Sequence, residues 1–221
     1  MRRVAAMCLL LALLAPGAAL ADVAPSSPIP PGGSPDRGGT GIREHDGFYL
    51  RLGLGPGFSF GSFDAAGTSV DVKGVHIGTE LALGTTVAPG LVVGGGSFSM
   101  VVPAPKYETS GASLTAGTHH VSGVGPFVDY YLDPHGGLHL QGALLFSGAY
   151  VTAKDGRESA FGVGFGAMVG AGYEVWVGDQ WSLGPVVRLA YYRDQPKGSD
   201  TEIKATLSLV SPTLLLGLTY H

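Results

Sequence analysis

The chain has 221 residues, of which 45% are hydrophobic and only 14% are charged. Soluble domains usually carry about 25% charged residues, so a soluble protein of this composition would struggle to cover its surface. The sequence also contains 37 glycines. Each glycine inside a helix costs up to about 1 kcal/mol relative to alanine, which argues against a helical protein. The formal net charge of -4 gives no indication of a nucleic-acid partner.

Residues 1–21 have the features of a secretory signal peptide. Arg2 and Arg3 precede an apolar run from Val4 to Ala15, and Ala19-Leu20-Ala21 provides a cleavage site. Cys8, the one cysteine of the sequence, lies in this segment, so the mature chain is expected to contain no thiol and no disulfide. We therefore expect the protein to be exported.

Residues 22–45 are rich in Pro, Gly and Ser and have no hydrophobic periodicity. They are expected to form a flexible periplasmic linker, or a tail without a role of its own. After the signal there is no apolar run of about 18 residues or more, so no transmembrane helix is expected. An exported, charge-poor chain of this kind is typical of an outer-membrane β-barrel, in which apolar residues occupy alternate positions. We expect residues 46–221 to form the barrel.

Bulky apolar residues alternate with small or polar ones in eight segments, as they do in membrane-spanning strands. The segments are residues 47–60, 73–87, 91–102, 120–132, 138–151, 161–177, 181–193 and 205–220. Each is long enough to cross a bilayer, which requires roughly 9–11 tilted residues. The bulky apolar side of each strand is expected to face lipid. In the third segment, where the alternation is weaker, that side carries Val92, Phe98, Met100 and Val102.

Short and long connections alternate along the chain. The short ones are residues 88–90, 133–137 and 178–180, and the longer polar ones are residues 61–72, 103–119, 152–160 and 194–204. Outer-membrane barrels have short periplasmic turns and longer outer loops, whereas a soluble β-sandwich has no reason to sort its loops in this way. The pattern predicts an all-β fold, an eight-stranded antiparallel up-and-down transmembrane β-barrel. Both termini are expected on the periplasmic side.

Five charges within the predicted strands lie on the side opposite to the bulky apolar residues. These inward-facing charges are Arg51, Glu80, Asp129, Glu174 and Arg188. A soluble barrel would instead place its bulky apolar residues inside. Because a lone buried charge is costly, we expect the two arginines to pair with the three acids in a lumenal polar network.

Aromatic residues cluster near the ends of the predicted strands. They are Phe48, Tyr49, Tyr130, Tyr131, Tyr173, Trp176, Trp181, Tyr191, Tyr192 and Tyr220. Such clusters are typical of the aromatic girdles that lie at the two membrane interfaces.

The signal peptide, the Gly-x-Gly strands and the segments GPFVDYYLDP (residues 125–134) and SLGPVVRLAYYR (residues 182–193) resemble the small eight-stranded outer-membrane β-barrels of the OmpA/OmpX type. In that family an aromatic residue normally ends the chain and serves as a signal for the barrel-assembly machinery; here Tyr220 is followed by His221. The resemblance implies a monomer in contact with outer-membrane lipid and lipopolysaccharide. No peptidoglycan-binding domain is expected after the barrel.

Gly162, Gly164 and Ala167 fit G-x-G-x-x-A, the fingerprint of a dinucleotide-binding turn. That motif requires a helix to follow, but residues 167–178 contain three glycines and no helical stripe. The stretch is better interpreted as a spanning strand with a bare lumenal face. Its glycines would make room for bulky inward residues such as Arg51, Phe127 or Arg188.

His120 and Ser122 resemble the His–Ser pair that outer-membrane lipid A deacylases use on the barrel wall. The next acids, Asp129 and Asp133, are expected near the opposite end of the strand, too far away to complete a catalytic set. The histidines do not converge on one point, as metal ligands must. We therefore predict no catalytic residue, no cofactor and no metal site.

The expected function is that of a non-enzymatic outer-membrane protein with a structural or surface-interaction role, such as adhesion or contact with lipopolysaccharide. The outer loops, which include Lys106 and Glu108, would make such contacts or would simply be solvated. A narrow, porin-like channel is the first alternative, although eight strands enclose little more than side chains. A lipid A-modifying enzyme on the barrel wall is the second.

Overall fold

The computed structural model describes residues 43–109, 112–115, 117–152, 158–197 and 205–221. The predicted signal peptide and residues 22–42 of the predicted linker lie outside these ranges. The strands are β1 (Phe48–Ala65), β2 (Thr68–Ala88), β3 (Leu91–Val102), β4 (Lys106–Thr109), β5 (Ala112–Thr115), β6 (Thr118–Tyr131), β7 (Leu138–Thr152), β8 (Glu158–Tyr173), β9 (Val175–Trp176), β10 (Trp181–Lys197) and β11 (Ala205–Tyr220). Within the described ranges, no helix is long and apolar enough to cross a membrane.

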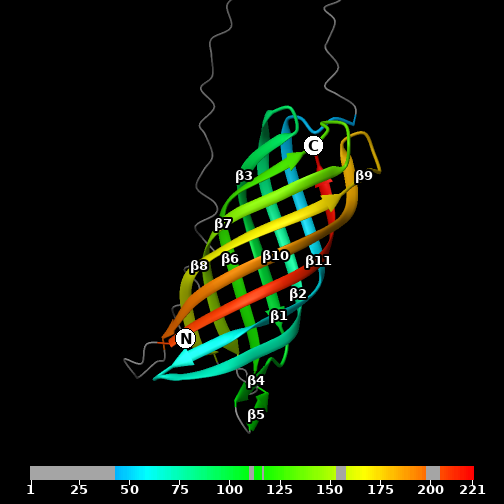
Figure 1. Ribbon diagram of the computed structural model, residues 1–221. Helices are drawn as coiled ribbons and strands as arrows, with labels where there is room; N and C mark the ends of the chain where they lie inside the picture. The colour runs from blue at the N-terminus through cyan, green and yellow to red at the C-terminus, as the bar shows by residue number, and fades with distance from the viewer. Residues whose placement is uncertain (1–42, 110–111, 116, 153–157, 198–204) are drawn as a thin grey trace, which may run out of the picture. The chain divides into compact units, whose positions relative to one another are not determined.

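Eight long strands close into one antiparallel barrel (Figure 1). Their order around the barrel is β1-β11-β10-β8-β7-β6-β3-β2, and β2 pairs with β1 to close the circle. Long strands that follow one another in sequence are therefore neighbours in space. The short strand β9 continues the line of β8 along β10, and β4 pairs with both β2 and β5. The predicted eight-stranded up-and-down barrel is confirmed.

The two ends of the barrel differ. The C-terminus lies at one end, together with the short connections between β2 and β3, β6 and β7, and β9 and β10. We call this the termini end. The β4–β5 hairpin projects from the opposite end, which we call the hairpin end (Figure 1).

Outside β3, the two faces of the strands are arranged as the alternation predicted. The outer wall exposes a continuous series of large apolar side chains, with Leu144 at 70% and Phe165 at 67% exposure. The inward positions carry glycines, small residues and the ionisable side chains. Water is a poor solvent for an apolar surface of this extent, so the wall requires an apolar environment such as lipid.

Strand β3 is oriented opposite to the prediction. Val92, Phe98, Met100 and Val102 are buried inside the barrel, and Phe98 is 0% exposed. Both faces of this strand carry apolar residues, so its own sequence does not define the outward face. The face is defined instead by pairing with its neighbours on both sides, β2 and β6.

The prediction of a long outer loop at residues 61–72 is wrong. Strands β1 and β2 continue through this segment and are joined by a two-residue turn at Ala66 and Gly67. Both turn residues have positive φ, 50° and 79°, as a type I′ hairpin turn requires. Alanine is uncommon in that conformation, which is why the sequence did not indicate a turn here.

The predicted aromatic girdle also needs correction. At the termini end, Phe48 and Trp181 are exposed on the outer wall, and both rings contact the ring of Tyr220. By contrast, three of the predicted girdle residues point inward and are buried in the lumen. They are Tyr49, Tyr131 and Tyr192.

The glycine-rich stretch from residue 162 to residue 167 lies inside β8, paired with β7 on one side and β10 on the other. The dinucleotide interpretation is therefore excluded. A Cβ atom on Gly172 would lie 2.1 Å from His139 Nε2, and one on Gly166 would lie 2.8 Å from Tyr192 Cδ1. The space over these glycines is thus filled by side chains of the adjacent strands, and not by Arg51, Phe127 or Arg188 as predicted.

Candidate functional site

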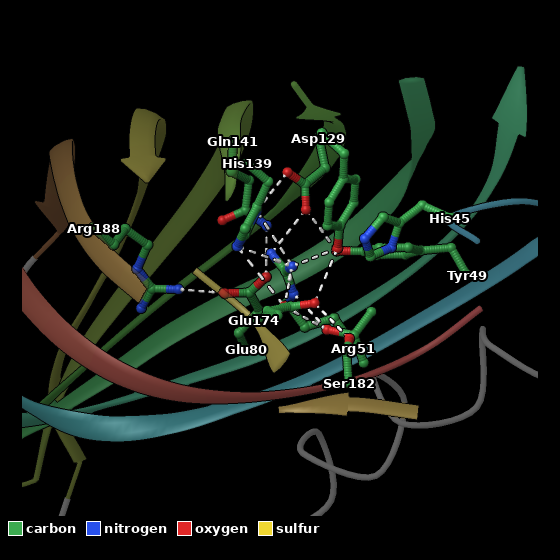
Figure 2. Close-up of polar contacts among 12 residues, drawn as sticks. His45, Tyr49, Arg51, Glu80, Asp129, His139, Gln141, Glu174, Ser182 and Arg188 are labelled. Carbon is green, nitrogen blue, oxygen red and sulfur yellow. Dashed lines mark hydrogen bonds and ion pairs between the residues drawn. The ribbon is translucent and has the colours of Figure 1, made fainter. Parts of the chain in front are cut away.

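A cluster of buried charges fills the lumen near the termini end, with Arg51 at its centre (Figure 2). The Arg51 guanidinium lies 2.8 Å from Asp129 Oδ2 and 2.5 Å from Glu174 Oε1. It also donates hydrogen bonds to Tyr131 Oη at 3.0 Å and Thr219 Oγ1 at 3.1 Å. The partners come from β6, β11 and the break between β8 and β9, so this one side chain connects opposite walls of the barrel.

The two acids of this cluster have further partners. Asp129 accepts a hydrogen bond from Tyr49 at 2.8 Å, and its other oxygen lies 2.8 Å from His139 Nδ1. Glu174 accepts hydrogen bonds from Ser182 at 2.6 Å and from Thr219 at 2.8 Å. Charge-assisted bonds of this kind offset the cost of removing the ions from water.

A second group lies next to the first along the lumen (Figure 2). Arg188 Nη1 lies 3.4 Å from Glu80 Oε2, and Gln141 donates a hydrogen bond to Glu80 Oε1 at 2.7 Å. The five ionisable residues singled out in the sequence are thus all buried in the lumen, and they form two ion-paired groups, Arg51–Asp129–Glu174 and Arg188–Glu80.

Two histidines cap the Arg51 cluster at the termini end. A hydrogen bond of 3.0 Å joins His45 Nδ1 to His221 Nε2, and His45 Nε2 donates to the Gly136 carbonyl at 2.8 Å. The His45 ring also stacks on Tyr131, with a centroid distance of 3.5 Å, and on Trp176 at 4.8 Å. Both imidazoles are buried.

The backbone around His45 is held by the connections at the same end. Arg43 N donates to Asp179 O at 3.0 Å, and His45 N donates to Pro134 O at 2.9 Å. The His45 carbonyl accepts a hydrogen bond from Thr86 Oγ1 at 3.2 Å. Arg43 and His45, which belong to the segment predicted to be linker, thus contact the barrel. We call residues 43–47 the N-terminal strap.

Burial and, to a smaller extent, the neighbouring His221 together lower the pKa of His45 from 6.5 to about 3. The unfolded chain therefore binds this proton more tightly than the folded barrel does. We predict that the His45 contribution to stability is complete above pH 6.5 and is lost as the pH falls toward 3. Urea unfolding of the detergent-folded barrel at several pH values measures this. His45→Phe keeps a ring in the stack and should show a weaker pH dependence; an unchanged dependence would contradict the assignment.

The lumen is closed at the level of these clusters. Tyr49, Arg51, Asp129, Tyr131 and His139 each have 0% exposure. A water-filled pore passing these side chains would expose them, so the network is a dry plug. The carboxylates of Asp129 and Glu174 are paired with Arg51 and with hydroxyl groups inside the plug.

The His–Ser pair on the outer wall is not assembled as a catalytic dyad. Ser122 forms a hydrogen bond with Ser99 of the neighbouring strand. His120 stacks on Tyr150, with ring centroids 4.4 Å apart. In the part of the chain that the structure describes, no three His, Cys, Asp or Glu side chains are placed to hold a metal ion.

Sequence reasoning missed several members of the plug. The alternation in the sequence places His139 and Ser182 on the inward face but does not connect them with the charges, and Tyr49 and Tyr131 are among the predicted girdle residues. His45 was assigned to the linker. The one available signal was the strand alternation, which places residues 49, 129, 131 and 139 inward alongside Arg51.

Neither a protein-family model nor a curated protein sequence matches this chain. Among solved structures, the outer membrane protein AlkL superposes with a TM-score of 0.51 at 14% identity, covering 90% of this chain and 96% of AlkL. The fold is that of the small outer-membrane β-barrels. The match to Neisserial surface protein A (TM-score 0.49, 16% identity) covers 78% of this chain and 96% of that protein's chain. The match to OprG from Pseudomonas aeruginosa (TM-score 0.48, 12% identity) covers 81% of this chain and 99% of OprG.

Proposed function

We propose that this chain is an integral outer-membrane β-barrel protein with a plugged lumen, which acts through its surfaces and catalyses no reaction. Its role is structural or one of surface interaction, with outer-membrane lipid and lipopolysaccharide as its surroundings. The barrel-assembly machinery inserts it, and it works as a monomer. The observation that carries the proposal is the inverted barrel, with an apolar outer wall around a charged, dry interior.

The outer wall supports insertion in a membrane. Its exposed side chains include Leu54, Val75, Leu144, Phe165 and Val187, which come from five different strands. The eight long strands also pair in a closed circle, so that each has a neighbouring strand on both sides, as a lipid environment requires.

The plug argues against the channel alternative. We predict that the purified barrel, inserted in a planar bilayer, gives no conductance steps above the baseline. The reason is that Arg51, Asp129 and Glu174 close the lumen through direct ion pairs. A general porin in the same bilayer is the positive control. Regular steps from the wild-type barrel would contradict a plugged lumen and favour the narrow channel.

The geometry at Ser122 argues against the enzyme alternative. The Ser122 hydroxyl forms a hydrogen bond with Ser99. A serine without an oriented base is a poor nucleophile. Mass spectrometry of lipid A from cells with and without the protein tests this point. An unchanged lipid A profile is expected, and loss of an acyl chain that depends on Ser122 would overturn the proposal.

A further inference from the structure

Two adjoining grooves form a furrow on the outer wall, over β7, β8 and β10 toward the hairpin end and over β6, β7 and β8 nearer the middle. Toward the hairpin end it forms a groove of about 740 Å³, walled by the exposed rings of Phe146, Phe165 and Tyr191. A second groove of about 450 Å³ lies closer to the middle of the wall, and the two grooves share Ala167. The furrow arises because Ala167 is a small outward residue between larger ones.

A charged side chain lies at the wide end of this furrow. The strand register places Phe146 opposite Phe165, and Phe165 opposite Arg193. All three side chains point outward, and the two phenyl rings lie 5.3 Å apart. A guanidinium therefore stands beside an aromatic wall in one row across three strands.

The position of Arg193 along the barrel matches the level of lipid headgroups. Arg193 follows Trp181, which belongs to the girdle at the termini end, by twelve residues in β10. At about 3.3 Å per residue and a tilt of about 40°, this corresponds to about 30 Å along the barrel axis. The apolar band of such barrels is about 25 Å tall, so Arg193 lies just beyond it.

The charge of Arg193 is available to a ligand. Among the side chains that the structure describes, none forms a salt bridge with its guanidinium, and the acid whose charge it interacts with is Asp64. By contrast, the cation Lys73 on β2 lies 2.5 Å from Glu108. One acid, Asp64, lies on the other side of β11 from Arg193 and accepts a hydrogen bond from Ser62 at 3.0 Å.

We propose that this furrow is a binding site for a phosphorylated lipid of the outer leaflet, namely lipid A. Arg193 binds a lipid phosphate, and an acyl chain lies in the furrow along Phe165 and Ala167. A guanidinium suits a phosphate because it offers paired donors in a plane. The site rests on the proposed function, since it requires the barrel to span a membrane.

Native mass spectrometry of the detergent-folded barrel with bisphosphorylated lipid A tests this proposal. The wild type should retain one lipid A, and Arg193→Gln should weaken binding about tenfold, as expected for a lost charge-assisted bond. Ala167→Phe should also weaken binding, because it fills the furrow without changing any charge. Lys73→Gln, which removes a paired cation, is the matched control and should bind as the wild type does.

Two further ligands identify the chemistry that is recognised. The wild type should bind dephosphorylated lipid A as weakly as Arg193→Gln binds the bisphosphorylated form. Because the acyl chain contributes to binding, inorganic phosphate should not displace bound lipid A. Equal binding by the wild type, Arg193→Gln and Ala167→Phe would overturn the site. Heat-modifiable gel migration of the same samples separates the two proposals: a barrel that folds but shows no dependence on Arg193 contradicts only the lipid site, whereas a chain that does not fold as a barrel contradicts the proposed function.

Discussion

Replacing Arg51 by methionine is expected to cost the barrel about 3–5 kcal/mol of unfolding free energy, because it leaves buried charges without a partner. Asp129 and Glu174 would both lose their cation in a site with almost no water. Urea unfolding in detergent, followed by gel migration, measures the loss. The midpoint should fall far below that of the wild type.

A matched variant separates the effect of charge from that of packing. Arg51→Met combined with Asp129→Asn and Glu174→Gln removes all three charges while keeping the side-chain volumes similar. This triple variant should recover much of the lost stability, since a buried ion pair can be replaced by neutral groups at little cost. If the triple variant is less stable than Arg51→Met alone, the loss does not come from uncompensated charge.

Substitution of Gly164 is expected to prevent normal closure of the barrel. A Cβ atom there would lie 1.9 Å from the Arg193 carbonyl oxygen, which belongs to the backbone of the paired strand β10. Even Gly164→Ala therefore requires β8 and β10 to move apart. The expected cost is at least about 3 kcal/mol, the upper end for overpacked sites. Gly164→Trp should give no folded barrel, as seen by heat-modifiable migration.

Gly148→Ala is the control for this substitution. Gly148 lies on the neighbouring strand β7, and a Cβ atom there would come no closer than 3.7 Å to the atoms of residues other than its chain neighbours. Because these are ordinary van der Waals distances, this variant should fold like the wild type. Equal yields of folded barrel for Gly164→Ala and Gly148→Ala would show that the close approach of β8 and β10 is not required.

Gly164 also explains a contact between strands that are not neighbours. Ser147 on β7 and Asp194 on β10 both pair with Gly164, which lies between them. Because Gly164 has no side chain, the Ser147 hydroxyl reaches across β8 and donates to Asp194 Oδ1 at 2.7 Å. The G-x-G-x-x-A match therefore reflects lumenal packing and not phosphate binding.

The strands and their outward faces could be predicted because a lipid-facing wall imposes a strict period of two. The inward positions of Arg51, Glu80 and Arg188 follow from this period alone. The ion-pair partners of these residues do not follow from the period, because strand tilt and register determine which charges meet across the lumen. The predicted outward face of strand β3 was wrong because apolar residues lie on both of its faces. Its orientation is set only by pairing with the neighbouring strands.

Features outside the regular strands were harder to predict. The β4–β5 hairpin lies in a segment, residues 103–119, that was interpreted as loop because its strands are only four residues long. The N-terminal strap was missed because His45 follows a Pro- and Gly-rich stretch without periodicity. Its position depends on contacts with His221 and with Gly136, which are distant in sequence.

Fractionation combined with heat-modifiable gel migration tests the central claim most directly. If the chain is an integral outer-membrane barrel, it should sediment with outer membranes after a carbonate wash. It should also migrate faster unheated than boiled, because a closed barrel stays folded in detergent. A soluble periplasmic product with the same migration before and after boiling would contradict the account.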